Sequence, residues 1–347
     1  MFRIEMLPAH HGDAILIEYG DESAPRRVLI DGGTPESYEA VDARLAQIGK
    51  KVALELLVVT HVDEDHIGGT LKQLVENPSR LQPAEVWFNA YRHLVPPDRL
   101  GPAQGEVLST AITDLKWKWN AAFGGGSVVV PDEGPLKPIK LADGARITLL
   151  SPTWKKLGAL VETWQSACAT VGLSPGKGAK PADVLGKHAP PTSLDVETLL
   201  KAKFSSDSSK ANGSSIAFLF EFEGKRALFG ADAHPAVLLA SLKRLQKEPL
   251  TIDAFKVCHH GSQNNTSPAL LAALRCPRFL ISTNGDTFGH PDPAGIARLV
   301  ATSGPKTLYF NYDTDYTRPW AKASLRKKYE YEVEFPSEEA GRLVVDL

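Results

Sequence analysis

Short apolar stretches of this sequence repeatedly end in histidine or aspartate. Each of these stretches is typical of a strand, and a His or Asp stands in the loop that follows it: residues 27–30 precede Asp31, 54–60 precede His61, 226–230 precede Asp232, 252–257 precede His259, and 279–282 precede His290. Loops at strand ends are where α/β folds place much of their chemistry. The pattern therefore favours a layered α/β fold whose site is built from strand ends.

The order of the predicted elements recurs in the two halves of the chain. Each half runs hairpin, helix, strand: residues 14–19, 27–30, 38–48 and 54–60 in the first half, and 215–222, 226–230, 236–246 and 252–257 in the second. Residues 152–210 lie between them and are rich in Lys, Gly, Pro and Ser. We therefore expect a single domain over 1–347, with an internal pseudo-duplication and a helical, partly flexible insertion at 152–210.

Composition excludes several classes of protein. The chain has 347 residues, of which 43% are hydrophobic and 23% charged, as in globular proteins. Its net charge of −2 provides no strong overall field for nucleic acid or an anionic membrane. The three cysteines are scattered, and the sequence shows neither a secretory signal nor an apolar run of membrane-spanning length. We therefore expect a soluble, cytoplasmic protein.

The densest group of polar residues is His61-x-Asp63-x-Asp65-His66. Four ligands in six residues are too many for one helix face or for one tetrahedral metal, so we expect a tight loop that serves two ions. His and carboxylate together suit Zn²⁺, with Mn²⁺ or Fe as competitors. Two ions about 3.5–4 Å apart need a bridging carboxylate, for which Asp232 is the candidate, and His259 is expected to supply the closing ligand.

The loop Thr60–Gly69 resembles the signature loop of the metallo-β-lactamase superfamily, with Asp63 in place of the second histidine of H-x-H-x-D-H. Five further segments fit the ComEC-like branch, whose members include a metal-dependent nuclease: residues 12–17 (GDAILI), 29–33 (LIDGG), 230–233 (GADA), 256–262 (KVCHHGS) and 289–291 (GHP). The resemblance implies an α/β (α+β) fold in the form of a four-layer αββα sandwich, with the metals at one edge.

Site roles also follow from the resemblance, residue by residue. It implies that His61 and Asp63 bind one divalent ion, that Asp65, His66 and His259 bind another, and that Asp232 bridges them. The catalytic candidates are Asp65, which orients the nucleophile, His290, which protonates the leaving group, and His260. Candidates for contact with substrate or for support of the ligands are Asp31, Asn212 and Ser262. Many relatives carry a further histidine where this chain has Asn212, and an amide oxygen suits a harder ion than zinc.

The function expected from these residues is a metal-dependent hydrolase of ester bonds. The cofactors would be two divalent ions, Zn or Mn, that hold a hydroxide between them near neutral pH. The preferred activity is a phosphodiesterase or nuclease acting on nucleic acid or a small phosphodiester. The alternatives are a hydrolase of a small ester or lactone, and a metal-stabilised binding protein without turnover. Because a cytoplasmic nuclease needs restraint, a regulatory protein partner is a further hypothesis.

Overall fold

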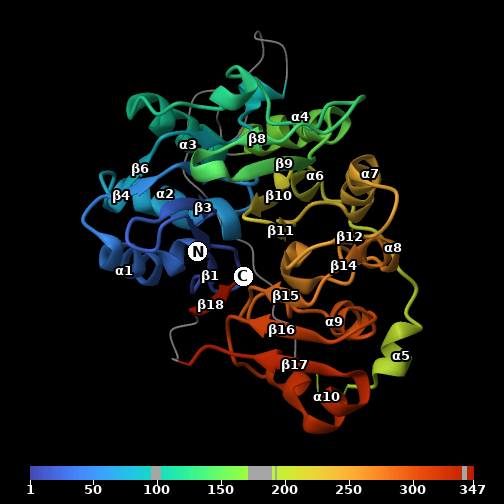
Figure 1. Cartoon of the computed structure of the whole chain (residues 1–347). Coiled ribbons are helices and arrows are strands. Elements are labelled where there is room, and N and C mark those ends of the chain that lie inside the picture. Colours follow the sequence, from blue (N-terminus) through green and yellow to red (C-terminus); the bar gives the residue numbers. More distant parts are fainter. Residues whose placement is uncertain (95–102, 171–189, 192–193, 338–341) are drawn as a thin grey trace.

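The computed structural model describes residues 1–94, 103–170, 190–191, 194–337 and 342–347. Its frame is one six-stranded and one eight-stranded mixed β-sheet (Figure 1). The six-stranded sheet has the order β18 (Leu343–Asp346), β1 (Phe2–Met6), β2 (Ile15–Tyr19), β3 (Arg26–Ile30), β5 (Leu56–Val58), β7 (Val86–Trp87). The eight-stranded sheet has the order β17 (Tyr331–Glu334), β16 (Lys306–Phe310), β15 (Arg278–Ile281), β13 (Ala254–Lys256), β11 (Lys225–Phe229), β10 (Ala217–Phe222), β9 (Arg146–Ser151), β8 (Ile139–Lys140).

The described residues also form two short strand pairs and ten α-helices, besides short 3-10 turns. The pairs are β4 (Val52–Leu54) with β6 (Leu81–Pro83), and β12 (Leu250–Thr251) with β14 (Leu274–Arg275). The helices are α1 (Tyr38–Ile48), α2 (Glu64–Glu76), α3 (Ala103–Asp114), α4 (Trp154–Thr170), α5 (Val196–Leu200), α6 (Lys210–Gly213), α7 (Pro235–Leu245), α8 (Pro268–Ala272), α9 (Pro293–Val300) and α10 (Ala323–Tyr329).

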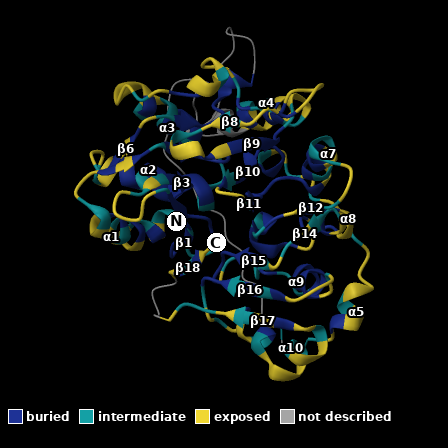
Figure 2. Ribbon diagram, in the orientation of Figure 1, coloured by how far each residue is buried: buried dark blue, intermediate teal, exposed yellow. Residues whose placement is uncertain are grey.

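The two large sheets face each other across one apolar core. The rings of Phe2 and Tyr19, on the six-stranded sheet, lie 5.1 and 5.3 Å from the ring of Phe220 on the eight-stranded sheet. Side chains of a strand alternate between its two faces, so Ile15 and Ile17 enter this core while Leu16 points to the opposite face. Figure 2 shows buried residues along both sheets, as a sandwich requires.

Helices cover the outer faces of both sheets. Leu16 shares a second apolar core with Leu45 of α1, Ile67 of α2 and Leu108 of α3. On the eight-stranded sheet, α7 packs against β9, where Ser241 donates a hydrogen bond to the Leu150 carbonyl. The layers therefore follow the order helix, sheet, sheet, helix (Figure 1), which confirms the predicted αββα sandwich.

The strand pairing repeats in the two halves, as the element order predicted. Strands β2 and β3 form an antiparallel hairpin, and β5 lies parallel to β3. Strands β10 and β11 form the equivalent hairpin, and β13 lies parallel to β11. Because parallel strands end on the same side of a sheet, the loops after β3 and β5 are neighbours, and so are the loops after β11 and β13.

One local expectation needs correction. The segment 61–66 was expected to be a tight loop, but α2 begins at Glu64, with Asp63 as its N-cap, so Asp65 and His66 lie in the first helical turn. Within the insertion 152–210, α4 contributes Leu157, Leu160 and Trp164 to the second core, and the described residues of this segment supply no strand to either large sheet. Residues 171–189 and 192–193 of the insertion lie outside the described residues.

No helix in the described ranges is both long enough and apolar enough to cross a membrane.

Candidate metal centre

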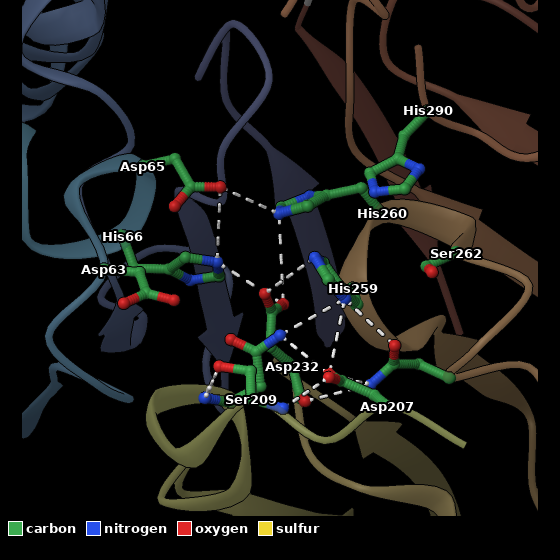
Figure 3. A network of polar contacts seen from close by, with 12 residues as sticks. Asp63, Asp65, His66, Asp207, Ser209, Asp232, His259, His260, Ser262 and His290 are labelled. Atoms are coloured by element: carbon green, nitrogen blue, oxygen red, sulfur yellow. Dashed lines mark hydrogen bonds and ion pairs between the residues drawn. The ribbon is translucent and has the colours of Figure 1, made fainter. Parts of the chain in front are cut away.

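Histidines and aspartates from both halves of the chain converge at the ends of strands β5, β11 and β13 (Figure 3). His61 follows β5, and Asp63, Asp65 and His66 lie at the start of α2. Asp232 follows β11, and His259 and His260 form a 3-10 turn directly after β13. The structure therefore brings together the residues predicted to bind metal: His61, Asp63, Asp65, His66, Asp232 and His259.

Asp232 stands between two pairs of histidines. Its Oδ1 lies 3.4 Å from His66 Nε2 and 3.9 Å from His260 Nε2. Its Oδ2 lies 3.8 Å from His61 Nε2 and 3.7 Å from His259 Nε2. Each oxygen of one carboxylate thus faces its own histidine pair, which is the arrangement that a bridging carboxylate requires.

His260, rather than His259, lies beside Asp65 and on the same side of Asp232 as His66. The Asp65 Oδ2 atom lies 3.2 Å from His260 Nε2 and 3.8 Å from His66 Nε2. His259 lies on the Asp232 Oδ2 side, together with His61. The sequence placed His259 with Asp65 and His66, and it offered no basis for choosing between two adjacent histidines whose backbone turn was unknown.

Each imidazole is held by a partner at Nδ1, so that Nε2 faces the centre. His66 Nδ1 lies 2.8 Å from Asp31 Oδ2, and His260 Nδ1 lies 2.8 Å from the Ser282 carbonyl oxygen. His259 Nδ1 lies 2.9 Å from Asn265 Oδ1. Such partners fix the tautomer and the ring orientation of metal-binding histidines, and Asp31 therefore has the orienting position that the sequence predicted.

The donor set fits divalent ions. Four side-chain atoms of the cluster are buried and have no hydrogen-bond partner among the described residues: Nε2 of His61, His66 and His260, and Oδ1 of Asp232. Buried polar atoms are rarely left in this state. Together with Asp65, these side chains form two compact groups, His61–His66–Asp232 and Asp65–His66–His260. Nitrogen and carboxylate donors of this kind suit Zn²⁺, Mn²⁺ or Fe.

Buried carboxylates and imidazoles shift one another's pKa values in this cluster. Burial favours neutral Asp65 and Asp232, but the adjacent histidines outweigh it and lower the pKa of both carboxyl groups. Burial likewise opposes protonation of His66 and His260, yet the surrounding carboxylates outweigh it, raising the pKa of His66 well above its usual value and that of His260 to about 9.

The backbone around the centre adopts conformations that few residues accept. His259 and His260 have φ values of 48° and 52°, in the left-handed region, where non-glycine residues are uncommon. A Cβ on Gly12 would lie 1.8 Å from the Asp65 carbonyl oxygen, so only glycine fits at this position. Such strain persists where the surrounding structure enforces it, as at functional sites.

Three other predicted residues lie around this cluster. The His290 ring lies 5.1 Å from that of His259, and His290 Nδ1 is 3.2 Å from Asp292 Oδ1. Burial lowers the pKa of His290 despite this carboxylate. Ser262 Oγ lies 3.4 Å from Asp292 Oδ2, and the Asn212 amide nitrogen is 3.3 Å from His259 Nδ1.

Four residues that support the centre were not predicted from the sequence. Asp207 and Asn265 lie behind His259, and an ion pair of 2.6 Å between Asp13 and Lys256 lies buried beside His260. A signal existed for Lys256, because a lysine inside an apolar strand needs a partner. Nothing in the sequence connects it with Asp13, and Asp207 lies in a serine-rich run that reads as a loop.

No family model and no curated protein matches the sequence. Among solved structures, the chain is similar to Zn²⁺-bound PqqB from Methylobacterium extorquens, with 12% identity over 99% of this chain and 100% of that one, at a TM-score of 0.42. It is also similar to the metallo-beta-lactamase fold protein YhfI from Bacillus subtilis, with 11% identity over 99% of each chain, again at 0.42.

A third similar structure is the CmlA beta-hydroxylase E377D mutant, with 12% identity and a TM-score of 0.41. The match covers 100% of this chain but 54% of that one, so this chain spans about half the length of that protein. At these values the likenesses carry no conclusion about activity, and any functional assignment depends on the chain's own residues.

Proposed function

We propose that this protein is a hydrolase with a dinuclear metal centre, of the metallo-β-lactamase type, that cleaves phosphodiesters. The observation that carries the proposal is the position of Asp232, whose two oxygens each face a separate histidine pair. One carboxylate placed in this way can join two ions, and two ions clamp both the attacking and the leaving oxygen of an in-line displacement. The resemblance to the ComEC-like branch supports the choice of phosphodiester.

Two sets of residues would bind the two ions, with Asp232 in both. His61, Asp63, Asp232 and His259 would hold one ion, and Asp65, His66, His260 and Asp232 the other. When bound, such ions would lower the pKa of a coordinated water and provide positive charge that stabilises the developing oxyanion. Asp65 Oδ2, close to both His66 and His260, is placed to orient the attacking water while it binds metal.

His290 is the proposed proton donor to the leaving group. Its Nδ1 is paired with Asp292, so Nε2 is the atom left for the substrate. In the absence of substrate, burial lowers the pKa of the His290 side chain. An anionic phosphate next to the imidazole favours the charged form and opposes that effect, so we expect His290 to take up its proton when substrate binds.

The substrate we favour is a short single strand or a small phosphodiester with an aromatic group. Extended duplex binding needs clustered Lys and Arg, and the net charge is −2. Phe288 is 44% exposed, and its ring lies 5.4 Å from His11 and 6.3 Å from His290. An exposed aromatic ring beside the proposed proton donor is suited to stack on a base or an aryl ester.

Metal content and ester hydrolysis test the proposal together. Wild type and Asp232→Asn, dialysed against metal-free buffer and then loaded with Zn²⁺ or Mn²⁺, would be compared by elemental mass spectrometry. We expect two ions per chain in wild type and fewer in the variant, with Asp132→Asn, an exposed aspartate, as the matched control. Loaded wild type should hydrolyse bis(p-nitrophenyl) phosphate.

Two outcomes would contradict the proposal in different ways. A folded wild-type chain that binds neither ion overturns the metal centre itself. A chain that binds two ions but cleaves a panel of lactones and carboxylic esters instead of the phosphodiester keeps the centre and replaces the substrate class.

A further inference from the structure

We propose that Asp207 is a positioning residue that decides which atoms Asn212 and Asn265 present to the His259 side of the centre. The inference rests on the proposed function only in taking the centre to hold divalent ions. Asp207 lies next to His259, on the side away from His260 (Figure 3). It lies within the serine-rich run at residues 205–209, and its described side-chain contacts include His259 but neither Asp65, His66 nor His260.

The Asp207 carboxylate is an acceptor for two side-chain amides. Its Oδ2 accepts hydrogen bonds from Asn212 Nδ2 at 2.8 Å and from Asn265 Nδ2 at 3.1 Å. Its Oδ1 accepts from the Ser209 backbone N–H at 2.8 Å. Because an ionised carboxylate offers acceptors only, both amides must turn their NH₂ groups toward it and their carbonyl oxygens away.

For Asn265 this orientation controls the tautomer of His259. His259 Nδ1 has two amide neighbours, Asn265 Oδ1 at 2.9 Å and the Asn212 amide nitrogen at 3.3 Å. The shorter contact is with the oxygen, so Asn265 accepts the Nδ1–H and leaves the Nε2 lone pair directed to Asp232 Oδ2, 3.7 Å away. The same NH₂ group also donates to the Asp232 carbonyl oxygen at 3.2 Å. Asp207 thereby connects the His259 ring with the loop that carries Asp232.

For Asn212 the orientation leaves an oxygen without a donor. Asn212 is 4% exposed, and its Oδ1 is buried and has no hydrogen-bond partner among the residues that the structure describes. It shares this state with Nε2 of His61 and Oδ1 of Asp232. A cation near His259 satisfies such an acceptor. We therefore assign Asn212 Oδ1 as an oxygen ligand of the ion on the His61 and His259 side, which favours Mn²⁺ there over Zn²⁺.

A substitution can separate this role from a purely structural one. Asp207→Asn keeps the Oδ1 acceptor for the Ser209 N–H, so the turn is preserved. It places an NH₂ group against the NH₂ groups of Asn212 and Asn265, and at least one of these amides must then reverse. The matched control is Asp195→Asn. Asp195 is the N-cap of α5, and its carboxylate likewise accepts a hydrogen bond from a backbone N–H, that of Thr198.

The test measures metal binding and the His259 tautomer in the same proteins. In metal-free wild type, imidazole ¹⁵N NMR, assigned with His259→Gln, should show the proton of His259 on Nδ1. In Asp207→Asn we expect a changed tautomer and a 10- to 100-fold loss of Mn²⁺ affinity by calorimetry, with a smaller loss for Zn²⁺. The double variant Asp207→Asn/Asn212→Asp restores a carboxylate against the new amide and should recover Mn²⁺ binding.

The outcomes distinguish this inference from the proposed function. An unchanged His259 tautomer together with unchanged Mn²⁺ affinity in folded Asp207→Asn overturns the inference and leaves the proposed function in place. A wild-type chain that binds no metal overturns the proposed function, while the tautomer still decides the role of Asp207. If Asp207→Asn does not fold, Asn212→Ser, which removes the buried oxygen, must show the selective loss of Mn²⁺.

Discussion

Asp31 accepts the Nδ1–H of His66 at 2.8 Å, and this bond turns the Nε2 of His66 toward Asp232. The same carboxylate accepts the backbone N–H and the hydroxyl of Thr60, each at 2.7 Å, and so fixes the backbone one residue before His61. A single buried aspartate therefore supports both halves of the candidate centre. A turn role for Asp31 alone would require none of these contacts.

Asp31→Asn should weaken metal binding without removing a ligand. The new amide can still accept from Thr60 but presents an NH₂ group to His66 Nδ1, which favours the tautomer with the proton on Nε2. Loss of such a partner lowers metal affinity about 10- to 100-fold, measurable by calorimetry with Zn²⁺ and Mn²⁺. Asp132→Asn is the control, and equal affinities in the two variants would contradict the prediction.

The sequence predicted most of the candidate ligands because they are local. His61 to His66 stand within six residues, and hydrophobic alternation places strands before them and before Asp232. What the sequence could not provide depends on long-range packing. Asp13 meets Lys256 across 243 positions. The choice between His259 and His260 depends on the left-handed conformation of both residues, which the sequence pattern does not specify.

The metal-free chain should be most stable near pH 6.5. His66 and His260 have raised pKa values, about 9 for His260, so their contribution is complete below about 6.5 and is lost as pH rises toward 9. Burial lowers the pKa of His11, His93, His234 and His290, so these groups contribute stability above about 6.5 that is lost as pH falls.

Urea unfolding with EDTA between pH 5.5 and 8.5 measures this profile. Burial raises the pKa of the Cys258 and Cys276 thiols to about 12 in the fold, so their ionisation in the unfolded chain would add to the decline at higher pH. The upper limit of 8.5 keeps the measurement below the ordinary thiol pKa of 9.0. His260→Gln should flatten the decline above pH 6.5, whereas His93→Gln should leave it intact. With saturating metal the trend should reverse above 6.5, because binding displaces protons. A metal-free stability that rises from 6.5 to 8.5 would count against the raised histidines.

Asp13→Asn should destabilise the metal-free fold strongly. Asp13 and Lys256 form an ion pair of 2.6 Å whose side chains are 3% and 2% exposed. Removing one charge leaves the Lys256 ammonium buried without compensation, which costs about 3–5 kcal/mol of unfolding free energy. Chemical denaturation in EDTA provides the measurement.

The matched control is Asp346→Asn, which breaks the exposed pair with Arg3 at 2.8 Å, where the side chains are 63% and 32% exposed. Such surface pairs contribute about 0–1 kcal/mol. The double variant Asp13→Asn/Lys256→Met should regain part of the loss because no buried charge is left. Equal losses of unfolding free energy in Asp13→Asn and Asp346→Asn would show that the buried pair stabilises the fold no more than the exposed pair does.

Phe288→Ala should weaken binding of aromatic phosphodiesters. Phe288 is among the few large hydrophobic side chains exposed in the described structure, and the only one of them in ring contact with His290. Stacking of an aromatic side chain on a base contributes about 1–3 kcal/mol. We therefore expect KM for bis(p-nitrophenyl) phosphate to rise about tenfold with kcat nearly unchanged, since Phe288 supplies no proton and no ligand.

Two comparisons make this prediction specific. Phe288→Trp keeps an aromatic surface and should retain a KM close to that of wild type, whereas Phe288→Leu, which keeps only apolar bulk, should resemble the alanine variant. Leu115→Ala removes another exposed apolar side chain, at the end of α3, and should change neither constant. Equal KM values for Phe288→Leu and Phe288→Trp would mean that Phe288 provides apolar contact rather than stacking, and the preference for aromatic esters would then have no support from this residue.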